Sequence, residues 1–373
     1  MLLSDAAEAL RARVAGIAER WYFPASAALL LFCVAWIGLG TLPHDEYLLA
    51  AQNPFESLRS FLYPVRNYFQ QSPLLPLTAY AAGLTSKAGF VTLCLGFIVL
   101  GFGAFASLAR VRYGRELGLI AAALALSHPV TLVMLSWVGT PDGITFLLTA
   151  CLLFARSSAW IAILCTIGAF NHPVMVFAAP VILVLRATSG EKECGFRQLL
   201  PAAAGLALGT AAVYLFLWHY KIGVFSRLDC IGTRTLGGWI KLNLTSFPLT
   251  LYSLHGPIWL ALAAAFIAAF SLDRRYFIVF ILCQLLFYGI TFFTEDTTRV
   301  FSLLTWAAAI HCILHAARLL EAKRNLRECA QYRAALIVIA IFGLLGPHYY
   351  LWNSTLRIPN FTEFWQSIAG ALT

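Results

Sequence analysis

Long apolar runs recur almost evenly along this chain, from about residue 22 to residue 352. Of its 373 residues, 60% are hydrophobic and only 12% are charged. A soluble domain carries roughly 25% charged residues, so this chain lacks the polar side chains that would cover a globule in water. A helix satisfies its own backbone hydrogen bonds in lipid. The pattern therefore predicts an all-α, polytopic transmembrane bundle in which residues 1–373 form a single membrane domain.

The apolar runs are long enough for about eleven transmembrane helices. The stretch 142–187 is broken at Arg156 and again at Asn171-His172-Pro173, so we interpret it as three short helices. Short or broken helices are tolerated where they line a protein cavity. The predicted spans are 22–42 (the first), 90–109, 117–138, 142–155, 159–171, 173–186 and 197–218 (spans 2–7, within 90–218), and 257–272, 275–293, 299–317 and 334–352 (spans 8–11, within 257–352).

Two long connections and a tail separate or follow these spans. Residues 43–89 form the first long loop, 219–256 form the second, and 353–373 form the tail. The first loop contains two stretches, Phe55–Phe69 and Leu74–Ala88, that we expect to be short amphipathic helices.

Basic residues are concentrated in every second connection between the predicted spans. The chain has 26 Lys and Arg residues and a net charge of +9, a balance that would also suit nucleic acid. Cytoplasmic loops of membrane proteins are enriched in Lys and Arg. We therefore expect a cytoplasmic N-terminus, a periplasmic C-terminus and location in a bacterial inner (plasma) membrane, with no nucleic-acid partner. The basic segments are 1–21, 110–116, 156–158, 187–196, 273–274 and 318–333.

Five polar clusters fall at the predicted outer ends of the spans. Ionisable residues at membrane depth usually face a cavity or a partner. The convergence of acids, histidines and an arginine on one side predicts an outward-facing site. Its candidate residues are His44, Asp45, Glu46, Arg66, Asp142, His172, His255, Glu295, Asp296 and Arg299.

Each cluster also has a purely structural interpretation. Asp142 follows a proline and suits a helix N-cap. Asn171-His172-Pro173 suits a turn between helices, and His255 suits a solvated loop. Asp296 and Glu295 suit a local ion pair with Arg299. These alternatives remain open on the sequence alone.

The chemistry of the residues suggests a division of roles. Asp45 or Glu46 could serve as a general base on an acceptor hydroxyl. Basic side chains of the outer loops could bind an anionic phosphate leaving group and stabilise its developing charge. Those basic residues are Arg59, Arg66, Lys221, Arg227, Arg234, Lys241 and Arg299.

The first loop and the turn at Thr140-Pro141-Asp142 resemble the type C membrane glycosyltransferases in layout. Pro43-His44-Asp45-Glu46 looks like the acidic first-loop motif of that superfamily, and the resemblance covers roughly residues 1–190. It implies that Asp45 is the catalytic base, with Glu46 as the second choice. It also implies a polyprenyl-phosphate sugar as the donor.

The leading hypothesis is a glycosyltransferase that moves a sugar from a lipid-linked donor to a lipid or glycan acceptor at the periplasmic face. A second hypothesis is an envelope glycan polymerase or ligase, in which Arg227, Arg234 and Arg299 would matter most. The third is a transporter or lipid carrier, for which polar residues near the bilayer midplane would be expected. Gln284 is one of few strongly polar residues well inside a predicted span.

No cofactor is implied with certainty, and a divalent metal remains open. The nine cysteines show neither a disulfide framework nor a metal-binding spacing. His311 and His315 lie four residues apart, a spacing that allows metal binding. Because no third ligand is near in the sequence, we interpret them as packing residues.

Overall fold

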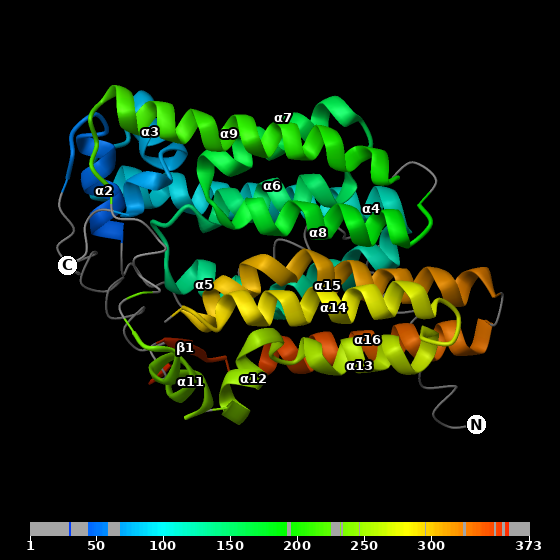
Figure 1. The fold of residues 1–373 in the computed structure, drawn as a ribbon. Helices are drawn as coiled ribbons and strands as arrows, with labels where there is room; N and C mark the ends of the chain where they lie inside the picture. The colour runs from blue at the N-terminus through cyan, green and yellow to red at the C-terminus, as the bar shows by residue number, and fades with distance from the viewer. Residues whose placement is uncertain are drawn as a thin grey trace, which may run out of the picture.

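The computed structural model describes residues 30, 44–58, 68–191, 195–224, 232, 234–245, 247–294, 296–323, 326–346, 348–352 and 355–357. This part of the chain is almost entirely helical (Figure 1). The first half contains α2 (His44–Gln52), η1 (Tyr68–Gln71), α3 (Leu74–Ala81), α4 (Lys87–Ser127), α5 (Pro129–Ser136), α6 (Asp142–Phe154), α7 (Ser158–Asn171) and α8 (Val174–Thr188). The second half contains η2 (Phe196–Gln198), α9 (Leu199–His219), α11 (Leu236–Leu244), α12 (Phe247–His255), α13 (Ile258–Ala269), α14 (Arg274–Thr291), α15 (Thr297–Ala322), α16 (Leu326–Leu345), β1 (Tyr350–Trp352) and β2 (Thr355–Arg357).

The long helix α4 is a helical hairpin. Gly114 has φ 83° and ψ 173°, a conformation outside the helical region. A Cβ atom on Gly118 would lie 2.7 Å from the Cα of Arg110. Residues eight apart in one continuous helix are separated by about 12 Å. The chain therefore reverses at Gly114, between the spans predicted at 90–109 and 117–138. The second of these predicted spans is not one helix, because α4 ends at Ser127, His128 is extended and α5 begins at Pro129.

Prolines mark several of the helix starts. Pro129 is the first residue of α5, while Pro141, Pro173 and Pro257 immediately precede α6, α8 and α13. Proline suits the first helical turn because the missing N–H has no intrahelical partner there. The three helices predicted between 142 and 187 are confirmed as α6, α7 and α8.

Several helices have the length and composition of membrane spans. Five described helices qualify, and a sixth span results if α12 and α13, which meet at a bend of 74°, are taken together. The helices α6, α7 and α8 are apolar but shorter than the roughly 20 residues that cross a bilayer straight. The predicted first span, 22–42, lies outside the described residues except for Leu30. The chain thus has the helices of a multi-pass membrane protein.

The structure corrects the predicted helices of the first loop. Residues 55–58 of the predicted Phe55–Phe69 helix are not helical, and 59–67 lie outside the described residues. Tyr68 and Phe69, at the end of the predicted segment, are in the 3-10 helix η1. A helix that the sequence did not predict, α2, precedes the segment at His44–Gln52, and Pro54 disfavours its continuation through Asn53. The second predicted helix, Leu74–Ala88, ends at Ala81, and a new helix begins at Lys87.

The last predicted span also needs correction. Helix α16 ends at Leu345, and residues 350–352 of the predicted span 334–352 form a strand instead. This strand pairs antiparallel with β2, with Tyr350 opposite Arg357. Of the predicted tail 353–373, the structure describes only residues 355–357.

The helices run back and forth between two ends of the bundle (Figure 1). One end, the α2 end, holds α2 and the starts of α6, α8 and α15. The opposite end, the Gly114 end, holds the Gly114 turn and the connections α6–α7, α8–η2, α13–α14 and α15–α16. Helix α15 is the central element: nearly all of its residues are buried, and it contacts α4, α6, α8, α13, α14 and α16.

Candidate functional site

A buried ion pair joins α6 to α15 at the α2 end. Arg299 donates from Nε to Asp142 Oδ2 at 2.7 Å and from Nη2 to Asp142 Oδ1 at 3.0 Å. The Asp142 side chain is 1% exposed and the Arg299 side chain is 11% exposed. Two parallel hydrogen bonds fix both the position and the plane of the guanidinium group. Asp142 is therefore the partner of Arg299 rather than the predicted N-cap, and α6 begins with no side-chain cap.

Two further groups hold the same guanidinium. Arg299 Nη1 donates to Asp296 Oδ2 at 3.3 Å, as the local ion-pair interpretation predicted. The guanidinium carbon lies 4.9 Å from the ring centroid of Trp137, which allows a cation–π interaction. One arginine is thus shared by two carboxylates and an indole. A phosphate at this position would have to compete with both acids for it.

Helix α2 lies at the same end of the bundle as this ion pair (Figure 1) and packs against η1, α3 and α4. Tyr47 is near enough to Arg299 for a long-range electrostatic effect and is buried, as is Glu46 beside it. His44 and Asp45 are the first two residues of α2, and their side chains lie outside the described part. The fold therefore brings the helix that carries the predicted base to the end where Asp142, Asp296 and Arg299 meet. Arg66 and Glu295 lie outside the described residues.

Asn171 and His172 form the predicted turn between α7 and α8. Asn171 is fully buried and donates through Nδ2 to Pro141 O at 3.1 Å and to Thr145 Oγ1 at 3.0 Å. Its Oδ1 atom is buried and has no hydrogen-bond partner among the described residues. His172 Nδ1 accepts the Val174 N–H at 3.2 Å and so caps α8. Asn171 therefore belongs to the surroundings of Asp142, whereas His172 has a local structural role.

His255 is not the solvated loop histidine of the structural interpretation, because it is fully buried. Its Nδ1 lies 3.2 Å from His128 Nε2, and its Nε2 lies 3.2 Å from Gln284 Oε1. The backbone N–H of Val130 donates to His128 Nδ1, so the proton of neutral His128 is on Nε2. The two neutral histidines then donate in sequence, from His128 to His255 and from His255 to Gln284.

A second polar cluster, absent from the sequence prediction, surrounds Glu191 at the Gly114 end. Its Oε1 lies 3.3 Å from Arg318 Nη1, 3.4 Å from Arg112 Nη2 and 3.7 Å from His311 Nε2, while Oε2 lies 3.3 Å from Arg186 Nε. Burial on its own raises the pKa of this carboxyl, but His311, Arg186 and Arg112 outweigh it and hold the pKa well below the ordinary value. Glu191 is therefore ionised and ties the α8–η2 connection to α4 and α15.

His311 and His315 have separate partners. Tyr276 Oη lies 2.7 Å from His311 Nδ1, and His315 Nε2 lies 3.0 Å from Asp273 Oδ2. The two imidazole rings are parallel, with centroids 6.2 Å apart. Within the described residues, no group of three or more His, Cys, Asp and Glu side chains is arranged to hold a metal ion.

Two features of the α2-end site are absent from the sequence prediction: Trp137, and Asn171 as a partner of α6. The position of Asn171 within the predicted Asn-His-Pro cluster could have signalled its role, and Tyr47 directly follows the predicted His44-Asp45-Glu46 cluster. No family model, curated protein or solved structure matches this chain.

Proposed function

We propose that this protein is a membrane glycosyltransferase that transfers a sugar from a polyprenyl-phosphate donor to a lipid or glycan acceptor at the α2 end. The observation that carries the proposal is the position of α2. The helix that bears Asp45 and Glu46 lies at the end of the bundle that holds the buried Arg299–Asp142 pair, and Tyr47 of this helix is within electrostatic range of Arg299. Carboxylates on a helix anchored beside a rigid ion pair suit a general base that must be held in place.

In this proposal, Asp45 accepts the proton of the acceptor hydroxyl, and Glu46 is the second candidate. Arg299 is already bound by Asp142 and Asp296, so its contribution is to fix the starts of α6 and α15 around the site. The lipid phosphate is then bound by a basic residue other than Arg299.

The proposed membrane arrangement comprises about eleven spans in a bacterial inner membrane, with the α2 end facing the periplasm. The connections at the Gly114 end coincide with the predicted basic segments 110–116, 156–158 and 273–274. Lys and Arg favour the cytoplasmic side, which supports a periplasmic α2 end.

The test is sugar transfer in right-side-out vesicles supplied with a polyprenyl-phosphate sugar and an external acceptor. Asp45→Ala is expected to lower the rate by a factor of about 10² to 10⁴, the range that a general base contributes. Glu46→Ala would do so if Glu46 were the base. Ser157→Ala, an exposed change at the Gly114 end, is the matched control. Full activity of both single variants and of the double variant would exclude this function.

A further inference from the structure

Helix α9 ends in a conformation that is unusual for a lysine. The Ile222 N–H donates to Leu217 O at 2.8 Å and the Lys221 N–H donates to Trp218 O at 3.1 Å, which together make a Schellman motif. The residue after the C-cap in this motif adopts a left-handed conformation and is usually glycine. Here it is Lys221, with φ 52°, the single non-glycine residue with positive φ in the described chain. A strained lysine where glycine would fit more easily suggests that the side chain itself is needed.

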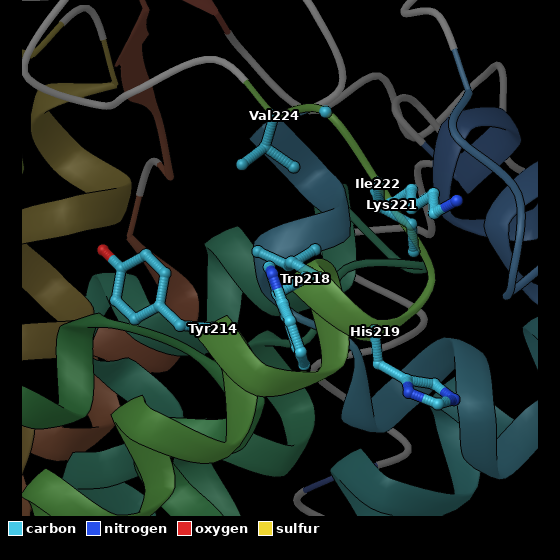
Figure 2. Close-up of a pocket in the computed structure, with 8 residues that line it drawn as sticks. Tyr214, Trp218, His219, Lys221, Ile222 and Val224 are labelled. Carbon is cyan, nitrogen blue, oxygen red and sulfur yellow. The ribbon is translucent and has the colours of Figure 1, made fainter.

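Lys221 lines an open pocket at the end of α9 (Figure 2). The pocket has a volume of about 610 Å³, within the range of small-molecule sites. Its floor is apolar, because Leu217 and Ile222 pack with Val213 in a small buried cluster. Tyr214 and Trp218, one helical turn apart, form its aromatic side. His219, Gly223 and Val224 complete the lining.

The same face of α9 continues as an exposed apolar surface. Leu208, Leu215 and Trp218 are 63%, 63% and 77% exposed. The segment Phe196–His219 has the length and hydropathy of a membrane span, so these side chains face lipid in a membrane. The pocket therefore lies at the end of a predicted membrane span. The exposed apolar surface of α9 adjoins it, and Lys221 contributes a positive charge to its lining.

The pocket is joined to the loop that follows α2. The Gly223 N–H donates to Ser57 Oγ at 3.1 Å. The ring of Phe55 lies 4.7 Å from that of Tyr220, between centroids, and 5.5 Å from that of Tyr80. These contacts place the end of α9 against the loop that directly follows α2, the helix that carries the candidate base in the proposed function.

We propose that this pocket binds an anionic lipid phosphate, that is, a lipid whose phosphate headgroup carries a net negative charge. The Lys221 ammonium group pairs with the phosphate, Tyr214 and Trp218 contact the first part of the chain, and the exposed leucines of α9 contact the remainder. Charge complementarity selects an anionic headgroup, and the position beside a span selects a lipid over a free anion. The inference rests on the proposed function only in naming an isoprenoid phosphate as the lipid; the binding itself requires no turnover.

The experiment is photolabelling with a farnesyl monophosphate that carries a diazirine on its chain, in phosphatidylcholine vesicles that contain the full chain. Peptide mapping is expected to find the label within residues 214–224. Lys221→Asn is expected to lower the labelling about tenfold, because a charge-assisted contact is lost while asparagine tolerates the left-handed conformation. Lys221→Arg restores the charge and should retain most of the labelling.

The matched control is Lys87→Asn, which removes an exposed lysine at the start of α4 on the same end of the bundle. Its labelling should equal that of the wild type. The corresponding diazirine farnesol should label weakly and be insensitive to Lys221→Asn. Equal labelling of the wild type and Lys221→Asn, or label confined to other residues, would overturn the proposal. Displacement by millimolar inorganic phosphate alone would show a free-anion site and overturn the lipid assignment.

The outcome is separable from that of the transfer assay. Labelling that depends on Lys221, combined with full activity of the Asp45 and Glu46 variants, would support the lipid site and exclude the proposed catalysis. Transfer that depends on Asp45 without labelling at 214–224 would remove only the lipid site.

Discussion

The buried positive charge of Arg299 is paired with two carboxylates, Asp142 and Asp296, which bind it with different strength. Asp142 binds it through two short hydrogen bonds and is buried, whereas Asp296 binds it through one contact of 3.3 Å and its side chain is 18% exposed. Removing one partner of a buried pair leaves the other charge uncompensated in a medium that solvates it poorly. The stability of this end should therefore depend on Asp142 far more than on Asp296.

We expect Asp142→Asn to lower the free energy of unfolding by about 3 kcal/mol. Asp296→Asn, the matched control on the same guanidinium, should lower it by about 1 kcal/mol or less. Thermal or chemical unfolding in detergent measures both. The double change Asp142→Leu with Arg299→Met should recover most of the loss, because it removes the charge together with its partner. Equal effects of the two single changes would contradict the assignment of Asp142 as the main partner.

Glycine spacing decides how closely α7 and α9 approach. A Cβ atom on Gly205 would lie 2.3 Å from Ala162 O, and one on Gly209 would lie 2.2 Å from Thr166 O. The two glycines are four residues apart and so present one smooth face to α7. Small residues at this spacing allow membrane helices to pack backbone against backbone.

Gly209→Val is accordingly expected to destabilise the protein by about 2 to 3 kcal/mol, since the backbone of α7 must move to admit a side chain. Gly289→Ala on α14 is the control, because a Cβ atom there meets nothing within 4 Å. Alanine in a helix interior is favoured over glycine by up to about 1 kcal/mol, so this variant should be at least as stable as the wild type. The midpoint of thermal unfolding in detergent compares the two. An unchanged midpoint for Gly209→Val would show that α7 and α9 are not in close contact.

At the Gly114 end of the bundle, ion pairs of Glu191 connect the α8–η2 connection to α4 and α15. Because the pKa of Glu191 is lowered by folding, its contribution to stability is fully present above the ordinary value of 4.5. The contribution is lost as the pH falls from that value toward the lower pKa of the folded state.

Glu191→Gln should therefore lower the thermal stability at pH 7, and the difference from the wild type should shrink as the pH falls below 4.5. Unfolding midpoints measured from pH 7 to pH 3 provide the comparison. Glu56→Gln, an exposed change in the loop that follows α2, serves as the control and should track the wild type. A difference between Glu191→Gln and the wild type that is constant with pH would exclude an ionised Glu191 as the source.

The local pattern of the chain predicted its helices well and its last strand poorly. The apolar stretch 142–187 carries its own stop and start signals at Arg156 and at Asn171-His172-Pro173, so the sequence predicts α6, α7 and α8. The same kind of signal at His128-Pro129, which separates α4 from α5, is not part of the prediction. The strand at Tyr350–Trp352 is as apolar as a helix end, and its pairing with β2 decides its conformation. The sequence predicts the connection 110–116 from the gap between two apolar runs, but the position of the reversal depends on one positive φ, at Gly114.

The candidate site was only partly predictable, because its contacts join distant segments. The sequence predicts that Asp142, Asp296 and Arg299 lie at the same side of the membrane. It does not show that Asp142 and Arg299, which are 157 residues apart, bind each other. His255 looked solvated because its local surroundings are Gly and Pro. Its burial depends on His128, 127 residues away, and on α14.

The amino-acid sequence by itself determined that this chain is a helical membrane protein and where most of its helices begin and end. The length of an apolar run and the residues that interrupt it are local properties of the chain, so they can be read directly from the sequence. Only the tertiary structure decided which charges neutralise each other, which histidines are buried and where a lysine lines a pocket. Those outcomes depend on how neighbouring helices pack, and helix packing is set by side chains far apart in the chain.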